Sequence, residues 1–167
     1  MEIRRIRPDD WPELRRVRLT ALQDAPEAFL TRHAEAVEYP DDLWKERARL
    51  GSSGNGQATF LLVEDEQACG MVIGLTRPED PSEVLLVGMW ISPAHRRARH
   101  GAALVERLVA WATEAGAHSV VLGVIEGNDS ALKLYESCGF VRTGERRDLP
   151  GHSARIEYTM QLQLSPA

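Results

Sequence analysis

Cysteine is scarce in this chain: among its 167 residues only Cys69 and Cys138 are cysteines. Two thiols cannot form a disulfide framework, and neither has a partner at the spacing of a structural zinc site. The sequence therefore predicts a fold that needs no metal ion. It also offers no motif for a covalent nucleophile, because Cys138 stands in a helix-ending segment without an evident base.

Long apolar runs and an excess of basic charge are absent as well. No apolar stretch approaches the ~20 residues of a membrane span, and the start of the chain, MEIRRIRPDD, has no apolar leader segment. A net charge of -5 argues against a general nucleic-acid binder, whose surface is normally basic. We therefore expect a cytoplasmic protein that binds neither membranes nor nucleic acid.

The composition is that of an ordinary folded protein. Apolar residues make up 43% of the chain and charged residues 27%. The only flexible-looking stretch, Gly51 to Gln57, has no comfortable independent domain on either side. We expect a single domain over residues 1–167.

The apolar patterns predict the element order β-α-α-β-β-β-α-β-α-β-β. Strands are expected at residues 2–7, 58–66, 68–77, 82–92, 118–126, 141–147 and 154–164, and helices at residues 9–23, 40–50, 101–115 and 128–140. Asp10 and Glu13 have the spacing of a capping box for the first helix, and Gly51 is expected to end the second. The step across residues 84–125 predicts a right-handed crossover between two parallel strands in a mixed α/β layer.

A basic turn, SPAHRRARHG at residues 92–101, connects the fourth strand to a helix. A strand that runs directly into a helix leaves the first helical N–H groups unpaired at the positive end of the dipole, which suits a phosphate or pyrophosphate. A solvated, basic helix start explains the same residues equally well. Nucleic-acid binding is disfavoured, because no aromatic residue is interleaved with the arginines.

Two segments together resemble the GNAT superfamily of acetyl-CoA-dependent N-acetyltransferases. In that family the segment R/Q-x-x-G-x-G/A holds the pyrophosphate of coenzyme A; RRARHG matches it at Arg96 and Gly101 but has Arg99 where glycine is expected. The segment NDSALKLYESCGF fits N-x-x-A-x-x-L-Y-x-x-x-G-F at Asn128, Ala131, Leu134, Tyr135, Gly139 and Phe140. The resemblance implies a GNAT-like α/β (α+β mixed) fold: a central mixed sheet of about seven strands with helices on both faces.

The resemblance also implies where acetyl-CoA binds. The implied coenzyme-binding residues are Met89, Trp90, Ile91, Arg96, Arg97, Ala98, Arg99, His100, Gly101, Ala102, Asn128, Ser130 and Tyr135. In the family the fourth strand carries a bulge, with which Gly88 is consistent, and a freed amide acts as oxyanion donor. Trp90 fits a core position equally well, and Asn128 can also cap its helix.

Arg99 is the main departure from the family pattern, and Arg97 also stands where glycine is frequent. If Arg99 has a positive φ, the arginine costs roughly 1 kcal/mol relative to glycine. If φ is ordinary, the guanidinium can swing outward or bond a phosphate. We expect coenzyme binding to be retained.

Tyr135 is the implied general acid, because a phenol with a pKa of about 10 is protonated at neutral pH. A half-buried aromatic on the helix face is its other interpretation. The base stays open. Glu83, thirteen residues before Arg96, resembles the acidic base of the histone-acetyltransferase branch, and Glu126 and His152 are its rivals.

The acceptor side is expected to be formed by the first two helices and their linker. Aromatic and acidic side chains meet there: Phe29, His33, Tyr39, Trp44, Glu35, Glu38, Asp41 and Asp42. That mixture could attract a cationic amine, and ordinary packing with a solvated helix start explains it too.

The preferred function is an N-acetyltransferase that moves an acetyl group from acetyl-CoA to a primary amine of a small molecule, directly and in a ternary complex. The alternatives are an impaired coenzyme-A-binding or structural module, and a protein N-terminal or lysine acetyltransferase. Exposed edge strands make a homodimer reasonable.

Overall fold

The computed structural model describes residues 1–149 and 155–165, which form one seven-stranded sheet in the order β1-β2-β3-β4-β5-β7-β6. The strands are β1 (Glu2–Arg5), β2 (Gln57–Glu64), β3 (Gln67–Arg77), β4 (Asp80–Ile91), β5 (Ser119–Ile125), β6 (Val141–Asp148) and β7 (Ile156–Gln163). The helices are α1 (Trp11–Asp24), α2 (His33–Ala36), α3 (Asp41–Ser52), α4 (His100–Glu114) and α5 (Asp129–Ser137), with single 3-10 turns η1 (Pro8–Asp10), η2 (Pro26–Ala28) and η3 (Pro93–His95). The predicted mixed class and seven strands are confirmed.

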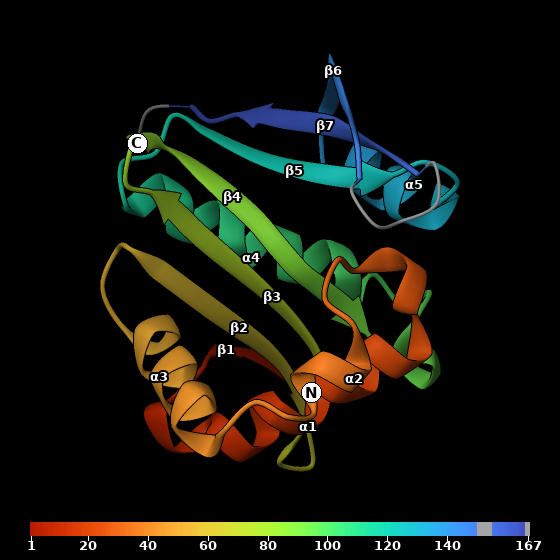
Figure 1. Cartoon of the computed structure of the whole chain (residues 1–167). Helices are drawn as coiled ribbons and strands as arrows, with labels where there is room; N and C mark the ends of the chain where they lie inside the picture. The colour runs from red at the N-terminus through yellow and green to blue at the C-terminus, as the bar shows by residue number, and fades with distance from the viewer. Residues whose placement is uncertain (150–154, 166–167) are drawn as a thin grey trace.

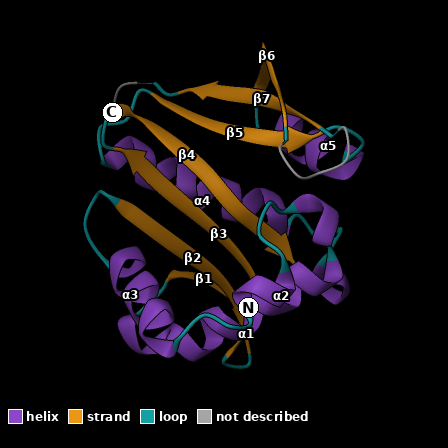
Figure 2. Ribbon diagram, in the orientation of Figure 1, coloured by secondary structure: helices purple, strands orange, loops and turns teal. Residues whose placement is uncertain are grey.

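Helices cover both faces of the sheet, as predicted (Figures 1 and 2). On one face, α4 and α5 bury an apolar cluster that includes Leu104, Leu108 and Tyr135 against β2 to β5. On the other face, α1 and α3 bury a second cluster that includes Val17, Trp44 and Trp90. The sheet is therefore a middle layer with an independent apolar core on each side.

The one parallel pair of the described sheet, β4 with β5, is short. Only Glu83, Val84 and Leu85 are in register with Ser119, Val120 and Val121. Beyond Leu85, β4 continues to Ile91 without pairing with β5, although it still pairs with β3 on its other side. The two strands therefore part, and the edge of β4 at residues 86–90 has no partner strand on the β5 side.

A β-bulge interrupts β4 inside this open stretch, at the expected place. Gly88 has a φ of +65°, and the register with β3 passes from Val87 opposite Ile73 to Trp90 opposite Met71. The extra residue reverses the alternation of side chains. Trp90 therefore packs with α1 and α3, away from the α4 cluster that contains Leu86.

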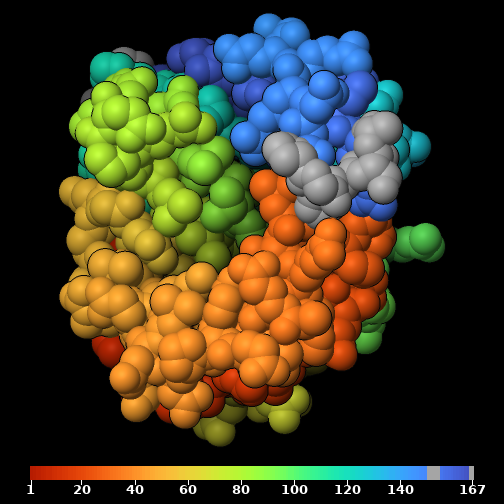
Figure 3. All heavy atoms as spheres, viewed as in Figure 1, coloured from red at the N-terminus to blue at the C-terminus, as the bar shows by residue number. Residues whose placement is uncertain are grey.

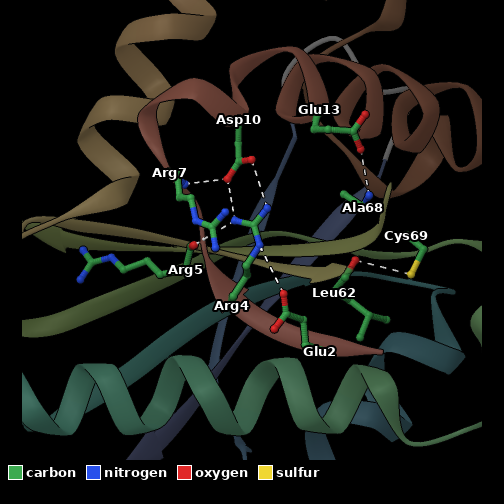
Figure 4. A network of polar contacts seen from close by, with 9 residues as sticks. All are labelled: Glu2, Arg4, Arg5, Arg7, Asp10, Glu13, Leu62, Ala68 and Cys69. Atoms are coloured by element: carbon green, nitrogen blue, oxygen red, sulfur yellow. Dashed lines mark hydrogen bonds and ion pairs between the residues drawn. The ribbon is translucent and has the colours of Figure 1, made fainter. Parts of the chain in front are cut away.

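The start of α1 is anchored differently from the prediction (Figure 4). The Asp10 carboxylate accepts hydrogen bonds from Arg4 Nη1 at 2.6 Å and from the Arg7 backbone N–H at 2.8 Å, and it does not cap α1. Glu13 accepts from the Ala68 backbone N–H at 2.8 Å. The predicted capping box is wrong because η1 occupies the turn ahead of α1, so both carboxylates instead tie this region to β1 and β3.

Gly51 does not end the second long helix, contrary to the prediction. The helix α3 continues through Ser52, and a Cβ atom on Gly51 would lie 2.5 Å from Thr59 Oγ1. The glycine is therefore there for close packing of α3 on β2.

Candidate active site at the open edge of β4

The backbone of the basic turn has a positive φ at two non-glycine residues. Arg97 has a φ of +67° and Arg99 a φ of +62°, while Ala98 between them does not have a positive φ. Arg99 is the N-cap residue of α4 in the αL conformation, and its side chain makes no capping hydrogen bond. Positive φ at alternate residues is a feature of backbone nests, in which successive N–H groups bind an anion.

The amides of this turn are unpaired. Within the described chain, no backbone or side-chain group accepts a hydrogen bond from the N–H groups of residues 96–102; the next residue, Ala103, donates to the Arg99 carbonyl at 3.0 Å. These N–H groups stand at the positive end of the α4 dipole. The turn can therefore hold a phosphate or diphosphate through its backbone.

The two αL arginines leave the turn open. The Arg99 side chain is 86% exposed, and its guanidinium lies 3.9 Å from the Glu106 carboxylate on the outer side of α4. Arg97 is exposed as well. Arg97 and Arg99 thus have the positive φ that glycine adopts readily at these positions of the family pattern. Both guanidinium groups remain exposed at the rim of the turn.

Arg96 and Trp90 are held by one carboxylate at the end of α1. Trp90 Nε1 donates to Asp24 Oδ2 at 2.9 Å, Arg96 Nη2 pairs with the same oxygen, and Arg96 Nε donates to the Ile91 carbonyl at 2.9 Å. The hydrogen bond from Trp90, together with Arg96, lowers the pKa of Asp24. The side chain of Trp90 is buried, so its core interpretation is the correct one, and the Arg96 guanidinium fixes the turn onto α1.

Gly101 brings the turn against the other two parts of the site. A Cβ atom at Gly101 would lie 3.3 Å from Leu134 Cδ2 in α5 and 3.4 Å from Met89 Cε beside the bulge. The first turn of α4, the second half of α5 and the bulged strand therefore meet at this glycine.

The helix α5 begins at Asn128 and presents Tyr135 to the same cluster. Asn128 Oδ1 accepts a hydrogen bond from the Ala131 backbone N–H at 3.3 Å, which confirms its N-cap role, and Ser130 Oγ lies 3.4 Å from the same oxygen. Tyr135 is only 7% exposed and packs at 5.8 Å from the Phe140 ring. Burial raises the pKa of Tyr135 well above the ordinary value, with Cys138 adding to the shift, so its hydroxyl keeps its proton.

The residues of this site lie within a region that matches a known protein family. The model of the Acetyltransferase (GNAT) family matches residues 6–140, which span the open edge of β4, the basic turn and α5. The chain belongs to the GNAT family.

Two curated relatives align with part of the chain. N-acetyltransferase 8 from Homo sapiens is 30% identical over 97 residues, which are 56% of this chain and 42% of the relative. N-acetylaspartate synthetase from Danio rerio is 36% identical over 98 residues, which are 58% of this chain and 34% of the relative. The matched region thus spans less than half the length of either relative.

Solved GNAT structures share the fold over nearly the whole chain. The acetyltransferase of the GNAT family from Streptococcus pneumoniae superimposes with a TM-score of 0.84 at 21% identity, covering 98% of this chain and 99% of its own. The structure of yncA from Salmonella typhimurium with its cofactor acetyl-CoA has a TM-score of 0.78 at 21% identity, covering 100% and 95%.

The candidate bases of this GNAT chain lie in different places. Glu83 stands at the closed end of the β4–β5 pair, where its Oε1 is 3.2 Å from Arg77 Nε. Five residues of extended strand, about 17 Å, separate it from Gly88. Glu126 accepts a hydrogen bond from the Tyr158 hydroxyl at 3.1 Å beside α5. His152 lies outside the described residues.

The acceptor side differs from the predicted aromatic surface. Phe29 and Trp44 are buried in the α1–α3 cluster, so they are core residues. Tyr39 donates to Glu35 at 2.9 Å and is covered by the Arg47 guanidinium at 5.0 Å. The rings of Phe29, Tyr39 and Trp44 are thus in contact with the chain's own arginines, Arg18 and Arg47.

Two residues of this region were missed from the sequence. Asp24 gave no signal, since its role depends on Trp90 and Arg96 some seventy residues away. Arg18 did carry a signal: it interrupts the apolar stripe of α1 at helical spacing from Leu14 and Leu22, where a charged side chain is unusual. Its surroundings are described below.

Two further findings on the described residues concern metal ions and membranes. No group of three or more histidine, cysteine, aspartate or glutamate side chains there could hold a metal ion, so the predicted absence of a metal stays a prediction. None of the described helices is both long enough and apolar enough to cross a bilayer.

Proposed function

We propose that this chain is an N-acetyltransferase that transfers the acetyl group of acetyl-CoA to a primary amine of a small molecule, within a ternary complex. The observation that carries the proposal is the continuity between two sets of free backbone groups. The unpaired N–H groups of residues 96–102 come one 3-10 turn, η3, after the open edge of β4 at residues 86–90. One ligand with a diphosphate and an extended amide-bearing arm can therefore bind both.

The residues around that path fit coenzyme A. The turn amides from Arg96 to Ala102 would bind the diphosphate, with the Arg97 and Arg99 side chains adding charge at the rim. The β4 edge at Met89, Trp90 and Ile91 would pair with the pantetheine arm as a further strand does. Asn128 and Ser130, at the start of α5, would contact the arm from the other side. When bound, acetyl-CoA supplies an activated acetyl thioester.

The chain's own groups can serve the transfer in two ways. A backbone N–H among residues 89–91, freed by the bulge, would stabilise negative charge on the acetyl oxygen. The Tyr135 hydroxyl would give its proton to the departing sulfur, because burial keeps that proton on the phenol. Glu83 is our candidate base, and at its distance from the bulge it would need a chain of ordered water molecules to reach the amine. It shares the sheet face of Leu85 and Val87, opposite α4, and Glu126 is its rival.

A small-molecule acceptor is supported by the region that covers the open edge. The Danio rerio relative is named for N-acetylaspartate, a small product. In this chain, η2 is tied across to β7 by a hydrogen bond of 2.8 Å from Arg155 Nη1 to the Glu27 carbonyl. The segment between α1 and α3 therefore spans the two halves of the sheet and narrows the approach of a large substrate.

Calorimetry and thiol release test the proposal together. The protein should bind acetyl-CoA and should release free thiol from it when primary amines are added. Acetyl-CoA binding without thiol release across a broad panel of amines would instead establish a coenzyme-binding module. Release with a peptide N-terminus or lysine peptide but with no small amine would replace the small-molecule acceptor by a protein.

A further inference from the structure

Arg18 of α1 carries a guanidinium that lacks a counter-ion. Its Nη1 atom is buried and makes no hydrogen bond, and no carboxylate of the described chain forms an ion pair with it. The guanidinium stacks at 4.8 Å on the ring of Phe29. A buried, unpaired N–H of a cation is costly, so its presence in a helix stripe calls for a partner that the folded chain does not supply.

A second arginine faces the same place. Arg47 of α3 lies 5.0 Å from the Tyr39 ring and 5.4 Å from the Trp44 ring, and it too forms no ion pair with a described carboxylate. Burial lowers the pKa of Arg18, and the charge of Arg47 lowers it further. A small anion bound at the Arg18 guanidinium would therefore be attracted by the charges of both arginines.

The position of this arginine pair relates it to the acetyl-transfer site. Phe29, which carries the Arg18 guanidinium, directly follows η2, and η2 bridges to β7 in front of the parted strands. Phe29 also belongs to the same apolar cluster as Met71 and Trp90, which pair beside the bulge. The Arg18 guanidinium therefore lies on the sheet face opposite α4, with the cluster that contains Phe29 and Trp90. On the molecular surface, Figure 3 shows a hollow between the segment that joins α1 to α3 and strands β3 and β4.

We propose that the acetyl acceptor is an amine that also carries a carboxylate, and that Arg18, with Arg47 as a second cation, binds this carboxylate. The inference rests on the proposed acetyltransferase function and narrows its substrate class to amino acids and similar zwitterions. A planar carboxylate can accept two parallel N–H bonds from a guanidinium, which would satisfy the orphaned Nη1. The bound carboxylate would fix the amine at a set distance from the β4 bulge.

Paired amines that differ only in the carboxylate test the assignment. Phenylalanine is compared with phenethylamine, and leucine with 3-methylbutylamine, by thiol release from acetyl-CoA. We expect kcat/KM to be at least tenfold higher for the better amino acid than for its partner amine. In Arg18→Gln that ratio should fall to about one, mainly through KM, while the rate with the partner amine stays unchanged. Arg49→Gln, an exposed α3 residue paired with Glu46, is the matched control and should keep the ratio.

Binding of the products gives a second readout that needs no turnover. N-acetylphenylalanine and N-acetylleucine are titrated into the protein by calorimetry, and we expect one of them to bind to the wild-type chain and to lose at least tenfold in affinity in both Arg18→Gln and Arg47→Gln. Thiol release at equal rates with both members of each pair, unaffected by Arg18→Gln, would overturn the carboxylate site and leave the acetyltransferase intact. Preference for phosphoethanolamine over every amino acid would overturn it as well. Failure to bind acetyl-CoA at all would overturn the proposed function itself.

Discussion

The proposed chemical role of Tyr135 can be tested directly. It is buried, no described group accepts or donates a hydrogen bond at its hydroxyl, and its pKa is raised by burial. A raised pKa keeps the acid form populated, so any loss of activity from its deprotonation falls above about pH 10, the ordinary pKa of tyrosine.

Tyr135→Phe should lower kcat at least tenfold and change the dissociation constant of acetyl-CoA by less than threefold. The phenyl ring keeps the packing against Phe140, and only the proton donor is lost. A thiol-release assay measures kcat, and calorimetry measures the dissociation constant of acetyl-CoA. Unchanged kcat in this variant would remove Tyr135 from the acid role, and an equal loss in coenzyme affinity would make it a binding residue instead.

Two substitutions of Arg99 distinguish the effect of backbone strain from the effect of side-chain charge. Its αL backbone favours glycine, and its exposed guanidinium makes only a distant contact with Glu106. Arg99→Gly should therefore raise the free energy of unfolding by about 1 kcal/mol. Arg99→Ala keeps the strain and removes the charge, so it should not stabilise the fold.

Coenzyme affinity of these two Arg99 variants then tells what the arginine contributes. If the guanidinium binds phosphate, both variants lose affinity equally; if the strain weakens the nest, Arg99→Gly gains affinity and Arg99→Ala does not. Urea unfolding and calorimetry on the same preparations give both quantities. A destabilised Arg99→Gly would contradict the αL assignment.

Among the elements, β4 shows best what a bulge does. One extra residue at Gly88 both frees backbone groups and moves Trp90 to the α1 face, where Asp24 holds it. Bulges are over-represented beside active sites, and here regular pairing would close the edge that a ligand needs.

Gly88→Ala should cost about 1 kcal/mol of stability, since alanine resists a φ of +65° and its Cβ would lie 3.2 Å from Ile73 Cδ1. It should also lower kcat/KM at least tenfold by shifting the bulge. Gly116→Ala is the matched control: its φ is +86°, nothing lies within 4 Å of its Cβ, and it ends α4 far along the chain from the bulge. It should cost similar stability and leave kcat/KM unchanged. Equal kinetic losses in both variants would reduce the Gly88 effect to general destabilisation.

The elements also show how far the sequence could be followed. Strand and helix patterns predicted all seven strands and the four long helices, because alternation and helical spacing are local. The basic turn and the Asn128 cap were predicted for the same reason. The side of the sheet to which Trp90 turns was not predictable, because one inserted residue reverses the alternation beyond it.

The remaining misses depended on contacts between distant segments. Asp10 and Glu13 have the spacing of a capping pair, but their hydrogen-bond partners are Arg4 in β1 and Ala68 in β3. Arg18 interrupts the apolar stripe of α1 in the sequence, but its stacking on Phe29 and its lack of a counter-ion follow only from the folded chain. Such roles follow from tertiary structure, which one sequence does not display.

Across the whole sheet, the weakest connection is the short pairing of β4 with β5, which we call the seam. Three register pairs between β4 and β5 join the strands β1 to β4 to the strands β5, β7 and β6, and beyond Leu85 the two parts separate. Helix α4 crosses behind the seam and contacts strands on both sides of it. A ligand that fills the opening should therefore join the two parts, in addition to meeting unpaired backbone groups.

Acetyl-CoA at a hundred times its dissociation constant should accordingly raise the free energy of unfolding by about 2.7 kcal/mol. Hydrogen exchange should slow at two places: the amides of residues 96–102 and those β4 amides of residues 86–91 that do not pair with β3. The β6 amides serve as the internal control, since every residue of that strand is exposed at the far edge of the sheet, and their exchange should not change. Slower exchange at residues 96–102 alone would mean that the turn binds the diphosphate without β4 pairing to the arm. The thioester would then have no fixed position beside Tyr135, because the bulged strand is what sets the distance between the turn and the transfer site.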